Sequence, residues 1–321
     1  MSNNPRTVAA LGEEIIKEVE KAIIGKRELL NQIITAVMVG GHVLIEDYPG
    51  LGKTLMAKSL ATALGLDFRR IQFTPDLLPG DITGGYVFDR SQSKFELRKG
   101  PIFANIILAD EINRASPKTQ SALLEAMQEG QVTLEGETQP LPKPFIVLAT
   151  QNPIEYEGTF PLPEAQLDRF IMKVSVGYPS AKDELEMLER RRDRRTDDVE
   201  IKRITNGEEL LQLRAAVEEV HINPDLNQYI IDIVSRTRAD KQVSVGASPR
   251  GSLALLKLSR AAAALADRGF VLPDDIKDFA IPALVHRLIL KPDLWLKRFA
   301  AEEIITAILD SQPVPVIESG A

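Results

Sequence analysis

A short stretch of the chain joins an apolar run to a glycine-rich turn that ends in Lys-Thr and opens a helix. Gly50 and Gly52 let backbone N–H groups approach an anion, and the new helix points its positive end at the same place. Lys53 lies in the first helical turn, where a cation opposes the helix dipole, so a bound triphosphate accounts for its position. Thr54 supplies a hydroxyl of the kind that such loops offer to Mg²⁺. The stretch predicts a phosphate-binding loop made of Pro49, Gly50, Leu51, Gly52, Lys53, Thr54 and Leu55.

The loop departs from the strict pattern G-x-x-x-x-G-K-[ST], which has glycine where this chain has Asp47. Aspartate tolerates left-handed backbone better than most residues, so the turn is still compatible with a phosphate loop. Short motifs also match by accident, and the alternative is an ordinary strand–turn–helix connection. The residues downstream make that alternative much weaker.

A second apolar run, Ile106–Ala109, ends in the two carboxylates of Asp110 and Glu111. Ligands of open α/β sheets bind at the carboxyl ends of strands, so this pair lies beside the phosphate loop if the two strands are neighbours. Asp110 would then hold the metal, usually through its water, and Glu111 would polarise the attacking water. A polar exit from a strand is the alternative, but such a pair is much less expected by chance after a phosphate loop.

Three polar residues further along the chain are also candidates. Asn152, at the exit of the predicted strand Phe145–Ala149, is a candidate to orient water or contact the γ-phosphate, but Asn-Pro favours turns, and taken alone this residue pair indicates a simple turn. Arg250 is a cation in the first turn of a predicted helix, and a phosphate reaching across a domain interface would account for it. Arg169 has two open interpretations, a phosphate contact or an ion pair with Asp168 or another acidic residue.

The first two-thirds of the chain alternates helical patterns with short apolar runs, which predicts an α/β fold with a parallel sheet wrapped by helices. The predicted strands are Val43–Ile45, Phe68–Phe73, Ile106–Ala109 and Phe145–Ala149. Two segments interrupt this order and are predicted to form β-hairpins, Tyr86–Leu97 and Gln131–Leu141.

A chain of 321 residues exceeds what one compact core usually holds, so two domains are expected. The character of the sequence changes after Pro179. We predict an α/β nucleotide-binding domain, a charged linker helix and a small all-helical domain, over residues 1–178, 179–205 and 206–321. The stretch Ala181–Arg195 is interpreted as a solvated connecting helix rather than a binding element. In the last domain a helix is expected from Ser248-Pro249 to Gly269, and another from Pro273.

Composition argues against several classes of protein. A net charge of −7 argues against a protein that grips nucleic acid with its whole surface, although a local basic pore is compatible with it. Cysteine is absent and the three histidines have no metal-binding spacing, so no thiolate or histidine metal site is expected. No run reaches the roughly 18 apolar residues of a membrane span, and residues 1–14 lack the apolar core of a signal peptide. A cytoplasmic location is expected.

The order of these motifs resembles that of the AAA+ ATPases, and their amino acids resemble those of the MoxR family in particular. The resemblance covers nearly the whole chain and rests on Glu46–Thr54, Ala109–Ala115 and Ala149–Pro153. An acidic pair before Pro-x-Gly is common in that family, so Asp47 reads as a family trait. The two predicted hairpins resemble the helix-2 insert and the pre-sensor-1 insert of the clade that includes magnesium chelatase and replicative helicase relatives.

The resemblance also implies roles for individual residues. Asn152 would be sensor 1, Arg169 the arginine finger and Arg250 sensor 2. The adenine pocket would be lined by the segment Ile23, Ile24, Gly25 and Lys26. The family implies a homo-hexameric ring that binds ATP and Mg²⁺ at subunit interfaces, where a finger from the neighbour accelerates phosphoryl transfer by ~10³ to 10⁵.

MoxR proteins resemble chaperones that mature or activate protein complexes, so a protein client and a partner with a von Willebrand factor A domain are implied, with metal or cofactor insertion as one form of this work. A nucleic-acid-translocating motor is the first alternative and needs basic or aromatic hairpin tips. The first hairpin offers Arg90 and Lys94, whereas the second offers Glu135, Glu137 and no cation. A metal-chelatase-type motor subunit is the second alternative, because it shares every ATPase residue.

Overall fold

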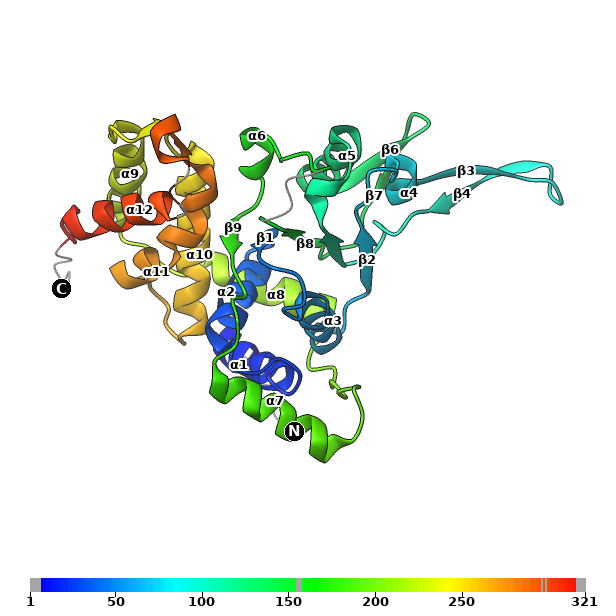
Figure 1. Ribbon diagram of the computed structural model, residues 1–321, viewed down its shortest axis with the longest axis horizontal. Helices are drawn as coiled ribbons and strands as arrows, with labels where there is room; N and C mark the ends of the chain where they lie inside the picture. Colours follow the sequence, from blue (N-terminus) through cyan, green and yellow to red (C-terminus); the bar gives the residue numbers. More distant parts are fainter. Residues whose placement is uncertain (1–6, 154–157, 296, 298, 316–321) are drawn as a thin grey trace.

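The computed structural model describes residues 7–153, 158–295, 297 and 299–315. Positions 1–6, part of the segment in which no signal peptide is predicted, lie outside the described residues. At the centre is a parallel sheet of five strands (Figure 1), which confirms the predicted α/β fold. In the order in which they pair, the strands are β2 (Phe68–Gln72), β5 (Ile106–Asp110), β8 (Ile146–Gln151), β1 (Val43–Glu46) and β9 (Met172–Val174).

The edge strand β9 is the one strand of this sheet that the sequence did not predict. It has three residues with Lys173 in the middle, which is too short and too interrupted to show a strand pattern. It is held by parallel pairing with β1, where Val43 lies opposite Met172 and Ile45 opposite Val174. Tertiary pairing therefore makes a strand from a segment whose local sequence does not specify one.

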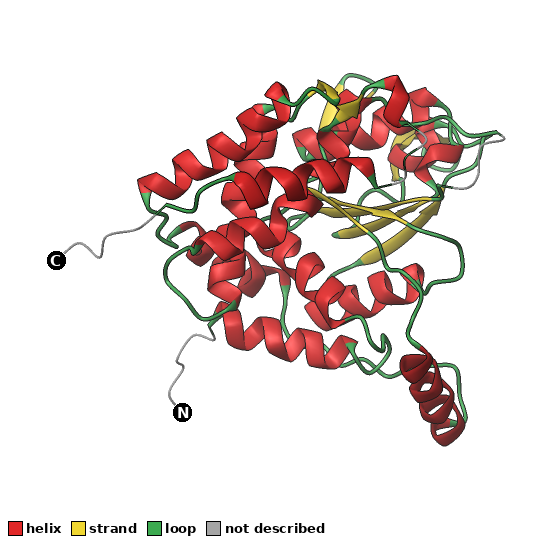
Figure 2. Cartoon of the chain, turned by 60° about the vertical axis from the view of Figure 1, so that its left-hand side comes forward, coloured by secondary structure: helices red, strands yellow, loops and turns green. Residues whose placement is uncertain are grey.

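Both faces of the sheet are covered by helices, as Figure 2 shows. Alternate residues of the central strands enter different hydrophobic clusters: Leu108 and Leu148 face one side, and Ile107 and Val147 face the other. The first side packs against α1 (Val8–Val19), α2 (Arg27–Met38) and α3 (Lys53–Leu64), and the second against α5 (Pro117–Glu129). Burial on both faces explains why these strands are continuous apolar runs.

The helix ends follow the sequence signals. Helix α3 begins at Lys53 after Gly52 and ends at Gly65, which has a left-handed φ of 64°. Helix α5 begins after Ser116, whose hydroxyl accepts the Thr119 N–H, and ends at Gly130. The capping residues in the sequence therefore account for these boundaries, and α3 in particular places the phosphate loop at its N-terminus.

Both predicted hairpins are present. The first consists of β3 (Gly84–Asp89) and β4 (Lys94–Lys99), follows the short helix α4 (Pro79–Thr83), and projects from the body of the molecule (Figure 1). The second consists of β6 (Gln131–Leu134) and β7 (Glu137–Pro140). The two strands of the first hairpin approach closely at its base. A Cβ on Gly84 would lie 2.1 Å from a backbone oxygen, so this position requires glycine.

After β9 the chain forms the charged helix α7 (Ala181–Arg194), which buries none of its residues and lies beneath α1 in Figure 1. Ser180 and Asp183 form a capping box at its start. Helix α8 (Gly207–Glu218) returns to pack on α1 and α2, and Arg214 Nε donates to the carbonyl of Val37 at 2.9 Å.

The rest of the chain is mainly helical and contains α9 (Pro224–Ala239), α10 (Pro249–Leu265), α11 (Pro273–Leu284) and α12 (Ala300–Ser311). The prediction of an all-helical domain is wrong in one respect, because β10 (Val243–Val245) pairs antiparallel with β11 (Ile289–Leu290). Such short strands leave no period-2 pattern in the sequence. Helix α10 also ends before the predicted Gly269, since Asp267 already has a left-handed backbone. Within the described ranges, no helix is long and apolar enough to cross a membrane.

Several one-turn elements complete the chain and connect the two parts. They are η1 (Ile112–Arg114), α6 (Glu164–Leu167), η2 (Val285–Arg287) and η3 (Pro292–Leu294). Of these, η1 follows the carboxylates of β5, and η2 packs beside β9 and α6. The largest hydrophobic cluster includes residues of α1, α3, α10 and α11, so the two parts of the chain share one core.

Candidate active site

The loop between β1 and α3 encloses one side of a cavity of about 400 Å³. Gly50 and Gly52 have φ angles of 84° and 78°, and a Cβ on either glycine would meet no atom within 4 Å. The glycines therefore serve the backbone conformation of the loop and leave open space in front of its N–H groups. All the predicted loop residues from Pro49 to Leu55 line this cavity.

Lys53 is held at the floor of the loop by backbone carbonyls. Its Nζ donates to the carbonyl oxygens of Asp47 and Tyr48, at 2.9 Å each. Burial lowers the pKa of Lys53 below its usual value, and the carboxylates of Asp47, Asp110 and Glu111 oppose this effect. The lysine is thus a partly desolvated cation whose charge is available to an anion bound in the loop.

The end of β5 brings both predicted carboxylates to the same cavity. Asp110 is the last residue of the strand and is buried; its Oδ1 accepts from Thr150 Oγ1 at 2.6 Å. Its Oδ2 accepts from Arg70 Nη2 at 2.7 Å and from Arg70 Nε at 3.0 Å. Arg70 and Thr150 come from the two strands that flank β5, β2 and β8.

Glu111 turns away from the strand direction because its backbone is left-handed, with a φ of 55°. This conformation costs a non-glycine residue about 1 kcal/mol, and the Glu111 N–H compensates by donating to Thr150 Oγ1 at 2.8 Å. The side-chain Oε2 accepts from Gln72 Nε2 at 2.6 Å and from Arg114 Nη1 at 3.1 Å. The turn aims the carboxylate at the cavity, where it has a defined orientation.

Asn152 follows β8 and lines the same cavity; it is buried. The structure therefore brings together five residues predicted from three separate segments, namely Lys53, Thr54, Asp110, Glu111 and Asn152. Sequence reasoning missed Arg70, Gln72 and Thr150. They could have been found in the same way as Asp110, because each is a polar residue at or near the carboxyl end of a predicted strand.

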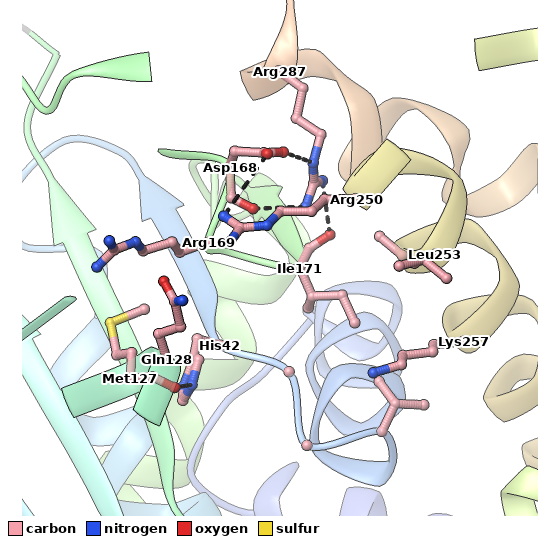
Figure 3. Close-up of a pocket in the computed structure, with 14 residues that line it drawn as sticks. His42, Met127, Gln128, Asp168, Arg169, Ile171, Arg250, Leu253, Lys257 and Arg287 are labelled. Carbon is pink, nitrogen blue, oxygen red and sulfur yellow. Dashed lines mark hydrogen bonds and ion pairs between the residues drawn. The ribbon is translucent and has the colours of Figure 1, made fainter. Parts of the chain in front are cut away.

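Arg169 and Arg250 lie elsewhere. They line a second cavity of about 310 Å³, together with Asp168, Lys257 and Arg287, and this cavity shares no lining residue with the phosphate-loop cavity. Figure 3 shows these side chains around one hollow between the α/β part and the C-terminal helices. Four cations and one carboxylate make the hollow strongly positive.

Asp168 joins the two parts of the chain at this second cavity. It accepts from Arg287 Nε at 2.8 Å and from Ser248 Oγ at 2.8 Å, and Arg250 Nη1 lies 4.0 Å away. Burial lowers the pKa of Arg287, and Asp168 opposes this shift. Asp168 thus has partners from the C-terminal helical part, and among the described residues no ion pair between it and Arg169 forms.

Arg169 has a buried Nε for which the described part of the chain offers no hydrogen-bond partner. A buried donor left unpaired costs roughly 1 to 3 kcal/mol, so this Nε is available to an acceptor that the described residues do not supply. The predicted alternative for Arg169, an ion pair with a neighbouring acidic residue, does not occur among the described residues.

The segment predicted to line an adenine pocket lies outside both cavities. Ile23 is buried, Ile24 follows it, and Gly25 has a φ of 69°. A Cβ on Gly25 would lie 2.2 Å from the Asp183 side chain, so the segment runs against the start of α7. The structure places Gly25 beside the start of α7, and neither cavity includes any of these residues.

The fold and the phosphate-loop site define an AAA-class ATPase. A family model described as "ATPase family associated with various cellular activities (AAA)" matches residues 42–172, and an AAA lid domain model matches residues 235–308. The chain is 40% identical over 316 residues to the Chaperone MoxR1 of Mycobacterium tuberculosis, covering 96% of this chain and 83% of the relative. It belongs to the MoxR family of AAA+ ATPases.

Two further comparisons agree over nearly the full length. The chain is 47% identical to the uncharacterized protein YeaC of Bacillus subtilis over 304 residues, which is 95% of each chain. A crystal structure of a protein from Cytophaga hutchinsonii that has been assigned as an ATPase superposes with a TM-score of 0.89 at 42% identity, covering 96% of both chains. The Cytophaga hutchinsonii protein therefore has the same arrangement of an α/β part and a helical lid.

Proposed function

We propose that this protein is an ATP-driven chaperone that remodels or matures a protein complex, and that it works as a homo-hexameric ring. The name of the Mycobacterium tuberculosis relative supports the chaperone role. The observation that carries the ring is the separation of Arg169 and Arg250 from their own phosphate loop, because arginines in a separate positive cavity can act on a nucleotide held by a neighbouring subunit.

The residues of the first cavity suit a complex of ATP with Mg²⁺. The Thr54 hydroxyl and the Asp110 carboxylate are hard oxygen donors that line one cavity, the ligand type that Mg²⁺ prefers. They would hold the ion, Asp110 through its water, and the ion would neutralise charge on the phosphate oxygens. The loop N–H groups and Lys53 would bind the β- and γ-phosphates.

The hydrolysis step then follows from the positions of two side chains. Glu111 would accept a proton from the water that attacks the γ-phosphate, because its carboxylate faces the cavity and is oriented by Gln72 and Arg114. Asn152 would orient that water as sensor 1. Arg169 and Arg250 of the neighbouring subunit would stabilise the charge that develops on the transferred phosphoryl group.

The first hairpin is the element best placed to act on a client. Phe88 and Phe95 form an edge-to-face pair with ring centroids 5.2 Å apart, and their exposed fractions are 49% and 68%. Exposed aromatic rings on a projecting ribbon suit contact with apolar segments of another protein. The proposal also includes a partner with a von Willebrand factor A domain. Insertion of a metal or cofactor into the client is one proposed outcome.

One observation favours a second candidate, a motor that translocates nucleic acid. The same hairpin carries Arg90 and Lys94 beside its two phenylalanines, and aromatic rings with cations are the combination that binds single strands. Stimulation of ATP hydrolysis by single-stranded DNA or RNA, lost on replacing Phe88 and Phe95 by alanine, would favour this candidate over the protein-directed chaperone.

The ring is tested by mixing two inactive variants. Lys53→Ala removes the loop cation and should weaken ATP binding, whereas Arg169→Ala keeps the loop and removes the finger. In shared rings some interfaces pair an intact loop with an intact finger, so activity should return. Arg192→Ala, an exposed arginine outside both cavities, is the matched control and should behave as wild type. If mixed rings form and no activity returns at any ratio, Arg169 does not act across the subunit boundary.

A further inference from the structure

Asp47 stands where the strict phosphate-loop pattern has glycine, yet the structure gives it a different role from a turn residue. Its backbone is not left-handed, unlike that of Gly50 and Gly52 in the same loop. The tolerance of aspartate for left-handed backbone, which the sequence suggested, is therefore not used. Asp47 is only 4% exposed, and a buried carboxylate is costly unless it is well hydrogen-bonded.

The Asp47 carboxylate accepts hydrogen bonds from both sides. The backbone N–H of Gly177 donates to its Oδ2 at 2.5 Å, and the Ser175 hydroxyl donates to the same oxygen at 2.8 Å. The Tyr48 N–H donates to Oδ1 at 2.8 Å. Burial alone would raise the pKa of Asp47, but these donors outweigh it and hold the pKa below its usual value, so the group is a carboxylate at neutral pH.

These contacts join two segments that are 128 residues or more apart in the chain. On the loop side, the Asp47 carbonyl accepts from Lys53 Nζ. On the other side, Gly177 leads directly into Tyr178, Pro179 and the capping box of α7. Asp47 thus connects the start of the phosphate loop to the segment that leaves the sheet after β9.

Two further contacts show that this connection is a packed junction. Lys26 Nζ donates to the carbonyls of Gly177 and Tyr178, at 3.0 and 2.9 Å. The rings of Tyr48 and Tyr178 stack with centroids 6.0 Å apart and an angle of 28°. Several contacts therefore connect the loop to Gly177, and among them the Asp47 carboxylate is buried.

We propose that Asp47 is a positioning residue, whose carboxylate holds the start of the phosphate loop against Ser175 and Gly177 and so links nucleotide binding to the start of α7. The proposal rests on ATP binding at this loop. It makes Asp47 act through the loop backbone and through Gly177, without touching the nucleotide.

The decisive variant is Asp47→Gly, because it completes the strict glycine pattern of a phosphate loop. If the turn alone mattered, this variant would bind ATP as tightly as wild type or more tightly. We expect instead an affinity for ATP about 10- to 100-fold weaker, the range for losing charge-assisted hydrogen bonds. The affinity of Asp47→Asn for ATP is also expected to decrease, since its amide group cannot accept hydrogen bonds from all three donors.

Ser175→Ala and Glu46→Gln complete the series. Ser175→Ala removes one donor and should weaken ATP binding by about 3- to 10-fold. Glu46→Gln is the matched control, because Glu46 also links β1 to β9 through a carboxylate, paired with Lys173, but does not contact the connection to α7. It should bind ATP within about 2-fold of wild type. If Asp47→Gly does not fold, Ser175→Ala alone carries the test of affinity.

A second measurement separates positioning from general stability. Amide hydrogen exchange at residues 175–183, measured with and without saturating ATP, should slow on ATP binding in the wild type and should change much less in Asp47→Gly and Ser175→Ala. Thermal unfolding of each variant shows whether the fold is retained. Wild-type affinity together with a wild-type exchange response in these two variants would overturn the inference. A wild type that neither binds nor hydrolyses ATP would overturn the proposed function instead.

Discussion

Replacing Glu111 by glutamine tests the proposed chemistry most directly. The variant keeps the size and shape of the side chain, and its amide oxygen can still accept from Gln72 Nε2, which lies 2.6 Å from the native carboxylate. The ion pair with Arg114 is lost, but the two side chains are 41% and 24% exposed, so this loss costs at most about 1 kcal/mol of stability. The loop, Lys53 and Thr54 are unchanged.

The lost function is general-base catalysis, which contributes typically 10² to 10⁴ in rate, or about 3 to 5 kcal/mol in the activation free energy. We expect kcat for ATP hydrolysis to fall in that range while the Kd for ATP stays within about 3-fold. Steady-state phosphate release and equilibrium binding of a fluorescent ATP analogue measure the two quantities. Glu219→Gln, an exposed carboxylate in the lid part, is the control and should leave both unchanged. A kcat equal to that of wild type would remove Glu111 from the catalytic role.

Two further predictions concern the hairpin and acid stability. Shortening the hairpin between Val87 and Leu97 should leave ATP binding intact and impair client maturation, because neither strand lines the phosphate-loop cavity; unchanged maturation in a side-by-side assay would make the hairpin dispensable. Burial lowers the pKa of His42 to about 4, and its Nδ1 accepts the Val147 N–H, so the folded state needs the neutral ring. Because the unfolded pKa is about 6.5, this stability is present above pH 6.5 and about 3 kcal/mol is lost as the pH falls towards 4. Urea unfolding of wild type and His42→Gln between pH 7.5 and 4.5 checks this, and equal pH dependence in both proteins would contradict it.

The phosphate loop was predictable because its chemistry lies in consecutive residues. Gly50, Gly52, Lys53 and Thr54 are placed relative to one another by a turn and the first turn of a helix, and both are local structures. The carboxylates of β5 were predictable for the same reason, since an apolar strand that ends in acidic residues is visible without its neighbours. That these segments meet in one cavity followed from the general rule for parallel sheets.

The partners of those residues were not predictable from spacing. Arg70 and Thr150 contact Asp110 from strands that lie about 40 residues before and after it, and only the strand order places them on either side. Similarly, Asp168 is paired with Arg287, 119 residues away, rather than with the adjacent Arg169. A local pattern offers each charged residue several partners, and the packing of the lid on the sheet selects one.

The phosphate loop, the acidic pair at the end of β5 and the hairpins could be predicted from the amino-acid sequence, because each depends on backbone and side-chain preferences within one turn or one strand. The tertiary structure alone decided that Asp47 is a buried link to Gly177, and that Arg169 and Arg250 share a cavity apart from Lys53. The physical reason is that distances between segments depend on strand order and helix packing. These are set by burial summed over the whole core, and no short stretch of sequence specifies that sum.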